Sequence, residues 1–79
     1  MKWNKAVDQI EQALAAGKAV SVRYHRKWMK QDEHFDKVYS VSRYVWNGQP
    51  LNDAVAVNTY YDQLLISSHI IDEVIIEER

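Results

Sequence analysis

The chain has 79 residues, with ten Lys and Arg, eleven Asp and Glu and no cysteine. This composition excludes a disulfide-stapled fold, a thiolate metal site and a cysteine nucleophile, and a net charge of −1 is not that of a general nucleic-acid binder. The sequence contains no apolar run long enough to span a bilayer, no signal peptide and no lipidation motif. We therefore expect residues 1–79 to form one small cytoplasmic domain with no membrane partner.

The first segment has the period of an amphipathic helix. Apolar residues recur at spacings of three and four, which places them on one stripe: Trp3, Ala6, Val7, Ile10, Ala13 and Leu14. Gly17 follows this stripe, where a helix most easily ends in a left-handed residue. The pattern predicts a helix over residues 3–16 that packs its stripe against the core.

Beyond Gly17 the apolar period changes to two, because Val20, Val22 and Tyr24 alternate with polar residues. This predicts a strand at about residues 19–27. Segments rich in Val, Ile and Tyr predict four more strands, at about residues 37–46, 54–61, 64–67 and 72–77. Between them we expect a loop over residues 29–36, a turn region from residue 47 to 53 that is too long for a two-residue hairpin, and a single helical turn over residues 67–69.

The order of these elements predicts an α+β fold, in which an N-terminal helix precedes a five-stranded antiparallel SH3-like or Sm-like small barrel. Closure of such a barrel removes the unpaired edges that a sheet rich in Val, Ile and Tyr would otherwise expose. The first and last strands are neighbours in this arrangement.

Three stretches of the sequence read IEQALAAGKAVSVRYHRK, VYSVSRYV and, near the end, LLISSHIIDEVII. They resemble the YolD-like family of small bacterial proteins, whose last segment has an I-P-F-x-x-I-I-D-I style. Two features differ, since Ser67 and Ser68 replace the Pro-Phe pair and the Gly that usually opens the second strand is absent. The aliphatic and acidic positions of the ending are occupied by Ile66, Ile70, Ile71, Asp72 and Val74.

The resemblance implies a phage- or plasmid-borne bacterial protein, grouped with Sm-like and WYL-type barrels and found near error-prone repair polymerases. The biochemistry of that family is unproven, and no catalytic residues come with it.

Residues 18–30 hold five basic side chains and no acid, with aromatic residues between them. Cations neutralise phosphates and aromatic rings stack on bases, so this pattern is typical of single-strand binding. The candidate nucleic-acid residues are Arg23, His25, Arg26, Lys27, Trp28 and, from a later strand, Arg43. The alternative is that Arg23 and Lys27 lie beside Glu73 and Glu77 of the acidic last strand, which would cancel their field.

Aromatic residues crowd the middle strands, and a small barrel interior admits few large rings. Alternation along a strand places Tyr60 and Tyr61 on opposite faces, so at least one of them is expected to be exposed. Exposed Tyr and Trp are common anchors of protein interfaces. The candidate interface residues are Tyr44, Trp46, Tyr60 and Tyr61; the alternative is that these rings pack the barrel against the helix.

The sequence offers little for catalysis or metal binding. His25, His34 and His69 have no partner at a metal-ligand spacing. Ser, His and Asp all occur within residues 67–72. The members of a catalytic triad converge from separate segments, so this close spacing argues against a triad. There is also no Gly-rich phosphate loop, and we expect no enzyme, no cofactor and no metal.

These patterns predict a non-enzymatic interaction module that binds an unknown protein partner, or itself as a homodimer, through exposed aromatic residues. It would act as a mobile-element or repair-associated regulator. The alternative is a nucleic-acid-binding Sm-like module that uses the basic and aromatic first strand.

Overall fold

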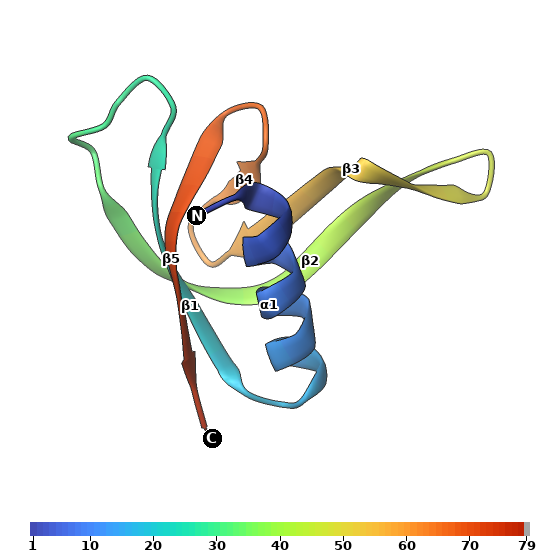
Figure 1. The fold of residues 1–79 in the computed structure, drawn as a ribbon, viewed down its shortest axis with the longest axis horizontal. Helices are drawn as coiled ribbons and strands as arrows, with labels where there is room; N and C mark the ends of the chain where they lie inside the picture. The colour runs from blue at the N-terminus through green and yellow to red at the C-terminus, as the bar shows by residue number, and fades with distance from the viewer. Residues whose placement is uncertain (79) are drawn as a thin grey trace.

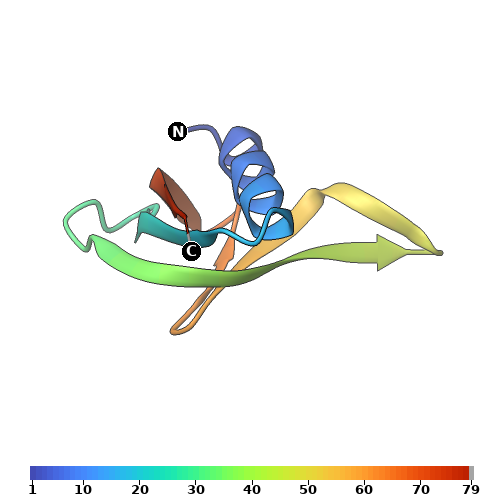
Figure 2. The same cartoon turned by 90° about the horizontal axis from the view of Figure 1, so that it is seen from below.

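A computed structural model describes the backbone of residues 1–78 and, within that range, every side chain except those of residues 44–46 and 50–55. One helix, α1 (Trp3–Ala15), precedes five strands: β1 (Ala19–Arg26), β2 (His34–Trp46), β3 (Gln49–Thr59), β4 (Gln63–Leu65) and β5 (His69–Glu77). The strands form one antiparallel sheet in the order β4-β3-β2-β1-β5. The helix lies over one face of this sheet, and the β2–β3 hairpin extends past it (Figure 1 and Figure 2). The predicted α+β architecture is confirmed.

The sheet is open rather than closed. Its edge strands are β4 and β5, and no ladder joins them within the described residues, so closure into a barrel is not shown. β1 does lie between β2 and β5, which makes the first and last strands neighbours as expected. Among the described residues, no helix has the length and apolar character needed to cross a membrane.

The end of α1 follows the predicted cap. Gly17 has a φ of +76°, its N–H donates to the carbonyl of Leu14 at 3.0 Å, and the N–H of Lys18 donates to the carbonyl of Ala13 at 3.0 Å. This pair of bonds is the Schellman motif, in which the left-handed residue is most often glycine because it has no Cβ. The motif turns the chain from the helix directly into β1.

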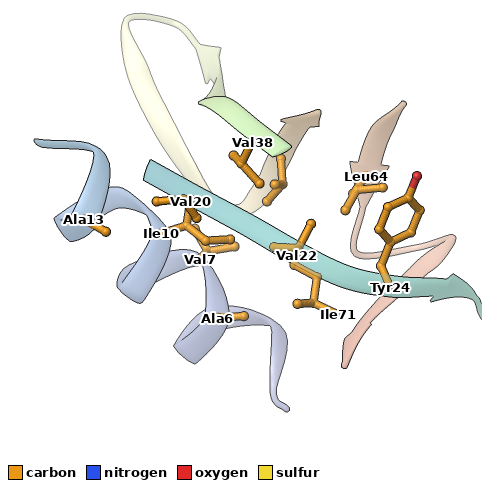
Figure 3. Close-up of a cluster of buried hydrophobic side chains, with 11 residues drawn as sticks. Ala6, Val7, Ile10, Ala13, Val20, Val22, Tyr24, Val38, Leu64 and Ile71 are labelled. Atoms are coloured by element: carbon orange, nitrogen blue, oxygen red, sulfur yellow. The ribbon is translucent and has the colours of Figure 1, made fainter. Parts of the chain in front are cut away.

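The core lies between α1 and the face of the sheet that the helix covers. Ile10 of the helix and Val22 of β1 have no exposed surface, and Figure 3 shows Val7 and Ile10 pointing toward Val20. The cluster also contains Ala6 and Ala13 of the helix and residues from every strand: Tyr24, Val38, Val57, Leu64 and Ile71. The apolar stripe of the helix, spaced by three and four residues, therefore packs against the apolar face of β1, spaced by two, in one apolar layer.

The β2–β3 turn differs from the predicted long turn region. Asn47 and Gly48 have φ angles of 51° and 78°, and Trp46 pairs with Gln49, so the two strands are joined by a two-residue hairpin. Positive φ at both central positions is what a type I′ turn requires, and Asn-Gly is its favoured sequence. β3 consequently starts at Gln49 instead of residue 54. It includes Pro50 next to the register shift between Arg43 and Val45, where a missing N–H is tolerated.

β2 begins three residues before its predicted start. His34 pairs with Tyr24, and Asp36 pairs with Val22, in a segment expected to be a loop because it is polar. Farther along, β2 shifts register between Val38 and Ser40 and again between Arg43 and Val45. A bulge exchanges the face of the sheet on which the later residues of a strand lie. These irregularities therefore explain why apolar residues occur at both odd and even positions of β2.

Ile10 tests the packing of α1 on the sheet, because its side chain is fully buried in the core. We expect Ile10→Val to lower the free energy of unfolding by about 1 kcal/mol and Ile10→Ala by about 3 kcal/mol, since each leaves a cavity. Urea denaturation followed by circular dichroism measures both. Ile66→Ala, at a position 39% exposed, is the matched control and should cost less. Equal losses for Ile10→Ala and Ile66→Ala would contradict this packing.

Candidate interaction surfaces

The basic first strand and the acidic last strand are side by side. Arg23 lies opposite Glu73 in the β1–β5 ladder, and its guanidinium contacts the Glu73 carboxylate at 3.1 Å and that of Glu33 at 3.3 Å. The predicted pairing of Arg23 with Glu73 is confirmed. The predicted placement of Lys27 beside the acids of the last strand is not observed, because Lys27 lies beyond the end of β1 and Glu77 pairs with Ala19.

A bulge in β5 gives His25 an acidic partner. Glu73 pairs with Arg23 and Ile71 pairs with Tyr24, so Asp72 is the extra residue between them. Its Oδ2 lies 2.7 Å from Nδ1 of His25. A bulge typically redirects a side chain in this way.

Arg43 is also held by an acid, although its partner comes from the helix. Its guanidinium donates a hydrogen bond to the carboxylate of Glu11, which raises the pKa of Arg43 above its ordinary value. Three of the six predicted nucleic-acid residues, Arg23, His25 and Arg43, therefore contact carboxylates. The other three, Arg26, Lys27 and Trp28, lie where β1 passes into the exposed β1–β2 loop.

Tyr60 and Tyr61 occupy a tight turn between β3 and β4 rather than the end of a strand. They are 67% and 89% exposed. The turn is closed by the N–H of Thr59, which donates to the carbonyl of Asp62 at 2.9 Å, and by the N–H of Asp62, which donates to Oγ1 of Thr59 at 2.9 Å. Both tyrosines are exposed because the chain reverses at them, not because strand alternation places one outward. The side chains of Tyr44 and Trp46 lie outside the described part of the chain.

The carboxylate of Asp36 anchors this turn to β2. Asp36 is only 7% exposed, its Oδ1 accepts the backbone N–H of Lys37 at 2.8 Å, and its Oδ2 accepts the backbone N–H of Tyr61 at 2.9 Å. The N–H of Tyr60 donates to the carbonyl of Lys37 at 3.3 Å. A carboxylate that accepts backbone N–H groups makes charge-assisted hydrogen bonds, which are stronger than neutral ones. The backbone of the Tyr60–Tyr61 turn is thus held by part-buried hydrogen bonds.

Two further aromatic residues complete a surface that we call the aromatic patch, made of Phe35, Tyr39, Tyr60 and Tyr61. All four are exposed, and the rings of Tyr39 and Tyr60 are 5.6 Å apart between centroids. Phe35, Tyr60 and Tyr61 line a shallow open pocket together with Asp36 and Lys37. Phe35 and Tyr39 were not among the predicted interface residues. The period-two run of Phe35, Lys37 and Tyr39 is the signal that identifies them.

A second polar cluster surrounds His69, which is 8% exposed. Its Nδ1 accepts hydrogen bonds from the N–H of Leu65 at 3.3 Å and from the hydroxyl of Ser68 at 2.7 Å. Because a backbone N–H can only donate, the neutral ring carries its proton on Nε2. That atom lies 3.8 Å from Oδ2 of Asp62 and has no hydrogen-bond partner among the described residues.

Tyr24 packs beside this histidine. Its ring stacks on His34 at 5.4 Å, meets His69 edge-on at 5.9 Å, and its hydroxyl lies 3.5 Å from Oδ2 of Asp62. Burial, together with the charges of Asp62 and Asp36, raises the pKa of Tyr24 above 10. The cluster therefore joins the end of β1 to the turn that carries Tyr60 and Tyr61.

The Ser-His-Asp letters of residues 67–72 are not brought together as one relay in the structure. Ser68 contacts His69, whereas Asp72 contacts His25, so these residues do not form one relay. No three His, Asp or Glu side chains in that part are placed to hold one metal ion.

Asp36 should be required for the stability of the Tyr60–Tyr61 turn. Asp36→Asn replaces one acceptor oxygen by an NH₂ group, so one backbone N–H loses its partner, and we expect the free energy of unfolding to fall by about 2 kcal/mol. Urea denaturation measures this loss, and amide hydrogen exchange at Tyr61 should become faster. Asp8→Asn on the exposed face of α1 is the control. Equal free energies of unfolding for Asp36→Asn and Asp8→Asn would contradict a stabilising role of the Asp36 carboxylate.

His69 should make folding weaker in acid. Burial lowers the pKa of His69 below its ordinary 6.5, an effect that Arg26 and His34 strengthen and the charge of Asp62 opposes. Below about pH 6.5 the unfolded chain therefore binds a proton at His69 more readily than the folded chain does. The free energy of unfolding is unaffected by this titration above that pH and decreases as the pH falls below it. Urea denaturation at a series of pH values should show this loss in the wild type and a smaller one in His69→Gln. The same pH dependence in both proteins would contradict it.

Comparison of the chain with protein-family models, with curated proteins and with solved structures returns no match. None of these comparisons bears on the resemblance to the YolD-like family, which stays a prediction.

Proposed function

We propose that this protein is a non-enzymatic interaction module that binds a protein partner, or a second copy of itself, through the aromatic patch. The observation that carries the proposal is the pair of exposed tyrosines, Tyr60 and Tyr61, on a turn whose backbone is bonded to the buried carboxylate of Asp36. Aromatic rings that stay largely in water contribute little to the stability of a fold. Binding gains from them because apolar area is buried when a partner covers it.

The rigidity of the patch supports a binding role. Tyrosine and tryptophan are enriched among the residues that dominate binding energy, and their few rotatable bonds keep the entropy cost of binding low. The turn bonds of Thr59 and Asp62 and the anchor at Asp36 fix the backbone beneath Tyr60 and Tyr61 before any partner arrives. Preorganisation of this kind increases affinity because less freedom is lost on association.

The charges around the patch favour a protein partner over a polyanion. Arg23, which pairs with Phe35 across β1 and β2, is neutralised by Glu33 and Glu73. Nucleic-acid binding through the first strand, as the sequence suggested it, has less support because Arg23, His25 and Arg43 already contact acids. Lys37 adds a positive group beside the pocket without making the surface strongly basic.

The proposal extends to the fold family. The strand order β4-β3-β2-β1-β5, with one short turn between β4 and β5, supports an open relative of the SH3-like or Sm-like barrel. Membership of the YolD-like family, a cytoplasmic location and a role as a mobile-element or repair-associated regulator are parts of the same proposal. The absence of cysteine supports the location, since the chain needs no oxidising compartment to fold.

The double variant Tyr60→Ala with Tyr61→Ala tests the proposal. Loss of two interface anchors should weaken binding by about 2 kcal/mol or more, which is roughly thirtyfold in Kd. Affinity capture at high salt, quantified by mass spectrometry, identifies the partner, and light scattering measures self-association. The purified partner is then titrated with both proteins.

Ile66→Ala is the control, because Ile66 is an exposed apolar residue outside the patch. It should retain the partner that the double variant loses. Equal binding by the wild type and the double variant, for the captured protein and for self-association alike, would show that the patch is not the interface.

A further inference from the structure

The β1–β2 loop, residues 27–33, carries the most exposed tryptophan surface among the described side chains. Trp28 is 70% exposed and the adjacent Met29 is 42% exposed. Residues 27–32 line a shallow hollow of their own. These side chains belong neither to the core cluster nor to the aromatic patch.

The loop is held by backbone bonds. The N–H of Met29 donates to the carbonyl of Arg26 and the N–H of Asp32 to that of Met29, both at 3.0 Å, which makes two successive turns. The N–H of Lys27 donates to the carbonyl of Ser68 at 3.1 Å and fixes the loop to the turn before β5. Trp28 therefore projects from an ordered backbone.

The acids of the loop are engaged with the strands, whereas its cations are not. Oδ2 of Asp32 lies 2.9 Å from Nε2 of His34, and Glu33 contacts Arg23. Three cations, one at the end of β1 and two in the loop, have no ion pair with any described side chain: Arg26, Lys27 and Lys30. Although the chain as a whole is nearly neutral, this loop presents a local positive field around one aromatic ring.

We propose that the β1–β2 loop binds single-stranded nucleic acid, with a base stacked on Trp28 and with Arg26, Lys27 and Lys30 contacting phosphates. Stacking of bases on aromatic side chains beside a cationic track is how single strands are held without sequence preference. A duplex is a poor ligand, since its bases are already stacked and Trp28 cannot reach their faces. This proposal is independent of the aromatic patch, which lies on other residues.

A flat anionic membrane fits the loop less well than a flexible strand does. A membrane would meet the whole loop at once, including Asp32 and Glu33, whose side chains are 40% and 55% exposed. Their charges would be repelled by anionic lipid even while paired. A single strand can follow the cations and avoid those acids.

Fluorescence anisotropy with a labelled oligothymidylate of about 12 nucleotides tests the proposal, since small single-strand sites cover a few to about 16 nucleotides. We expect binding below about 100 μM at low salt, with a log–log salt slope of about −2 for three phosphate contacts. Trp28→Ala should weaken binding about tenfold, and Trp28→Phe should restore most of it. Lys27→Gln with Lys30→Gln should reduce the slope to about −0.7.

The controls separate the loop from general electrostatics. Lys5→Gln removes one exposed charge from α1 and should leave binding unchanged, and unlabelled duplex of the same length should compete poorly. Thermal melts verify that each variant is folded. The proposal is overturned by absence of binding at about 100 μM, by equal binding of Trp28→Ala, or by equal competition from duplex. Sedimentation with phosphatidylserine vesicles in place of oligonucleotide binding would also overturn it and assign the loop to a lipid surface.

Discussion

The buried carboxylate of Asp36 connects the two parts of the molecule on which its proposed function depends. It lies in β2 opposite Val22 of the core strand β1, yet it accepts N–H groups from Lys37 and from the turn residue Tyr61. Burying a carboxylate is unfavourable unless hydrogen bonds compensate. Here one donor is the adjacent Lys37, and the other, Tyr61, lies 25 residues later in the chain. The β3–β4 turn can therefore take its position only when β2 is in place, so the aromatic patch and the core are formed together.

Local features of this fold are predictable from the sequence, and features that need a distant partner are not. The helix follows from the spacing of Val7 and Ile10, and its end follows from Gly17, because both signals lie within the helix itself. The start of β2 was missed because Asp36 is polar, and only its bonds to residues brought together by folding explain its burial. The predicted turn over residues 47–53 is longer than the observed two-residue turn although the Asn-Gly signal is local, because turn-forming residues continue as far as Asp53.

The candidate surfaces also contain some residues that a local pattern predicts and others that only folding brings together. Tyr60 and Tyr61 were predicted from the sequence, but Phe35 and Tyr39 join them only through the pairing of β1 with β2 and of β2 with β3. The small net charge does not reveal how the charged side chains are arranged in space. It is the sum of cross-strand pairs such as Arg23 with Glu73 and a loop in which the acids are engaged and the cations are not. Net charge thus gives little information on the local fields that a ligand would meet.

The bulge at Asp72 has a consequence for how copies of this protein meet. β5 is an edge strand of nine residues, and such an edge can pair with the same edge of another molecule. The extra residue kinks the strand, and Asp72, Glu73 and Glu77 would bring like charges together in an antiparallel pair of β5 strands. The kink and these acids therefore disfavour pairing between the β5 edges of two molecules.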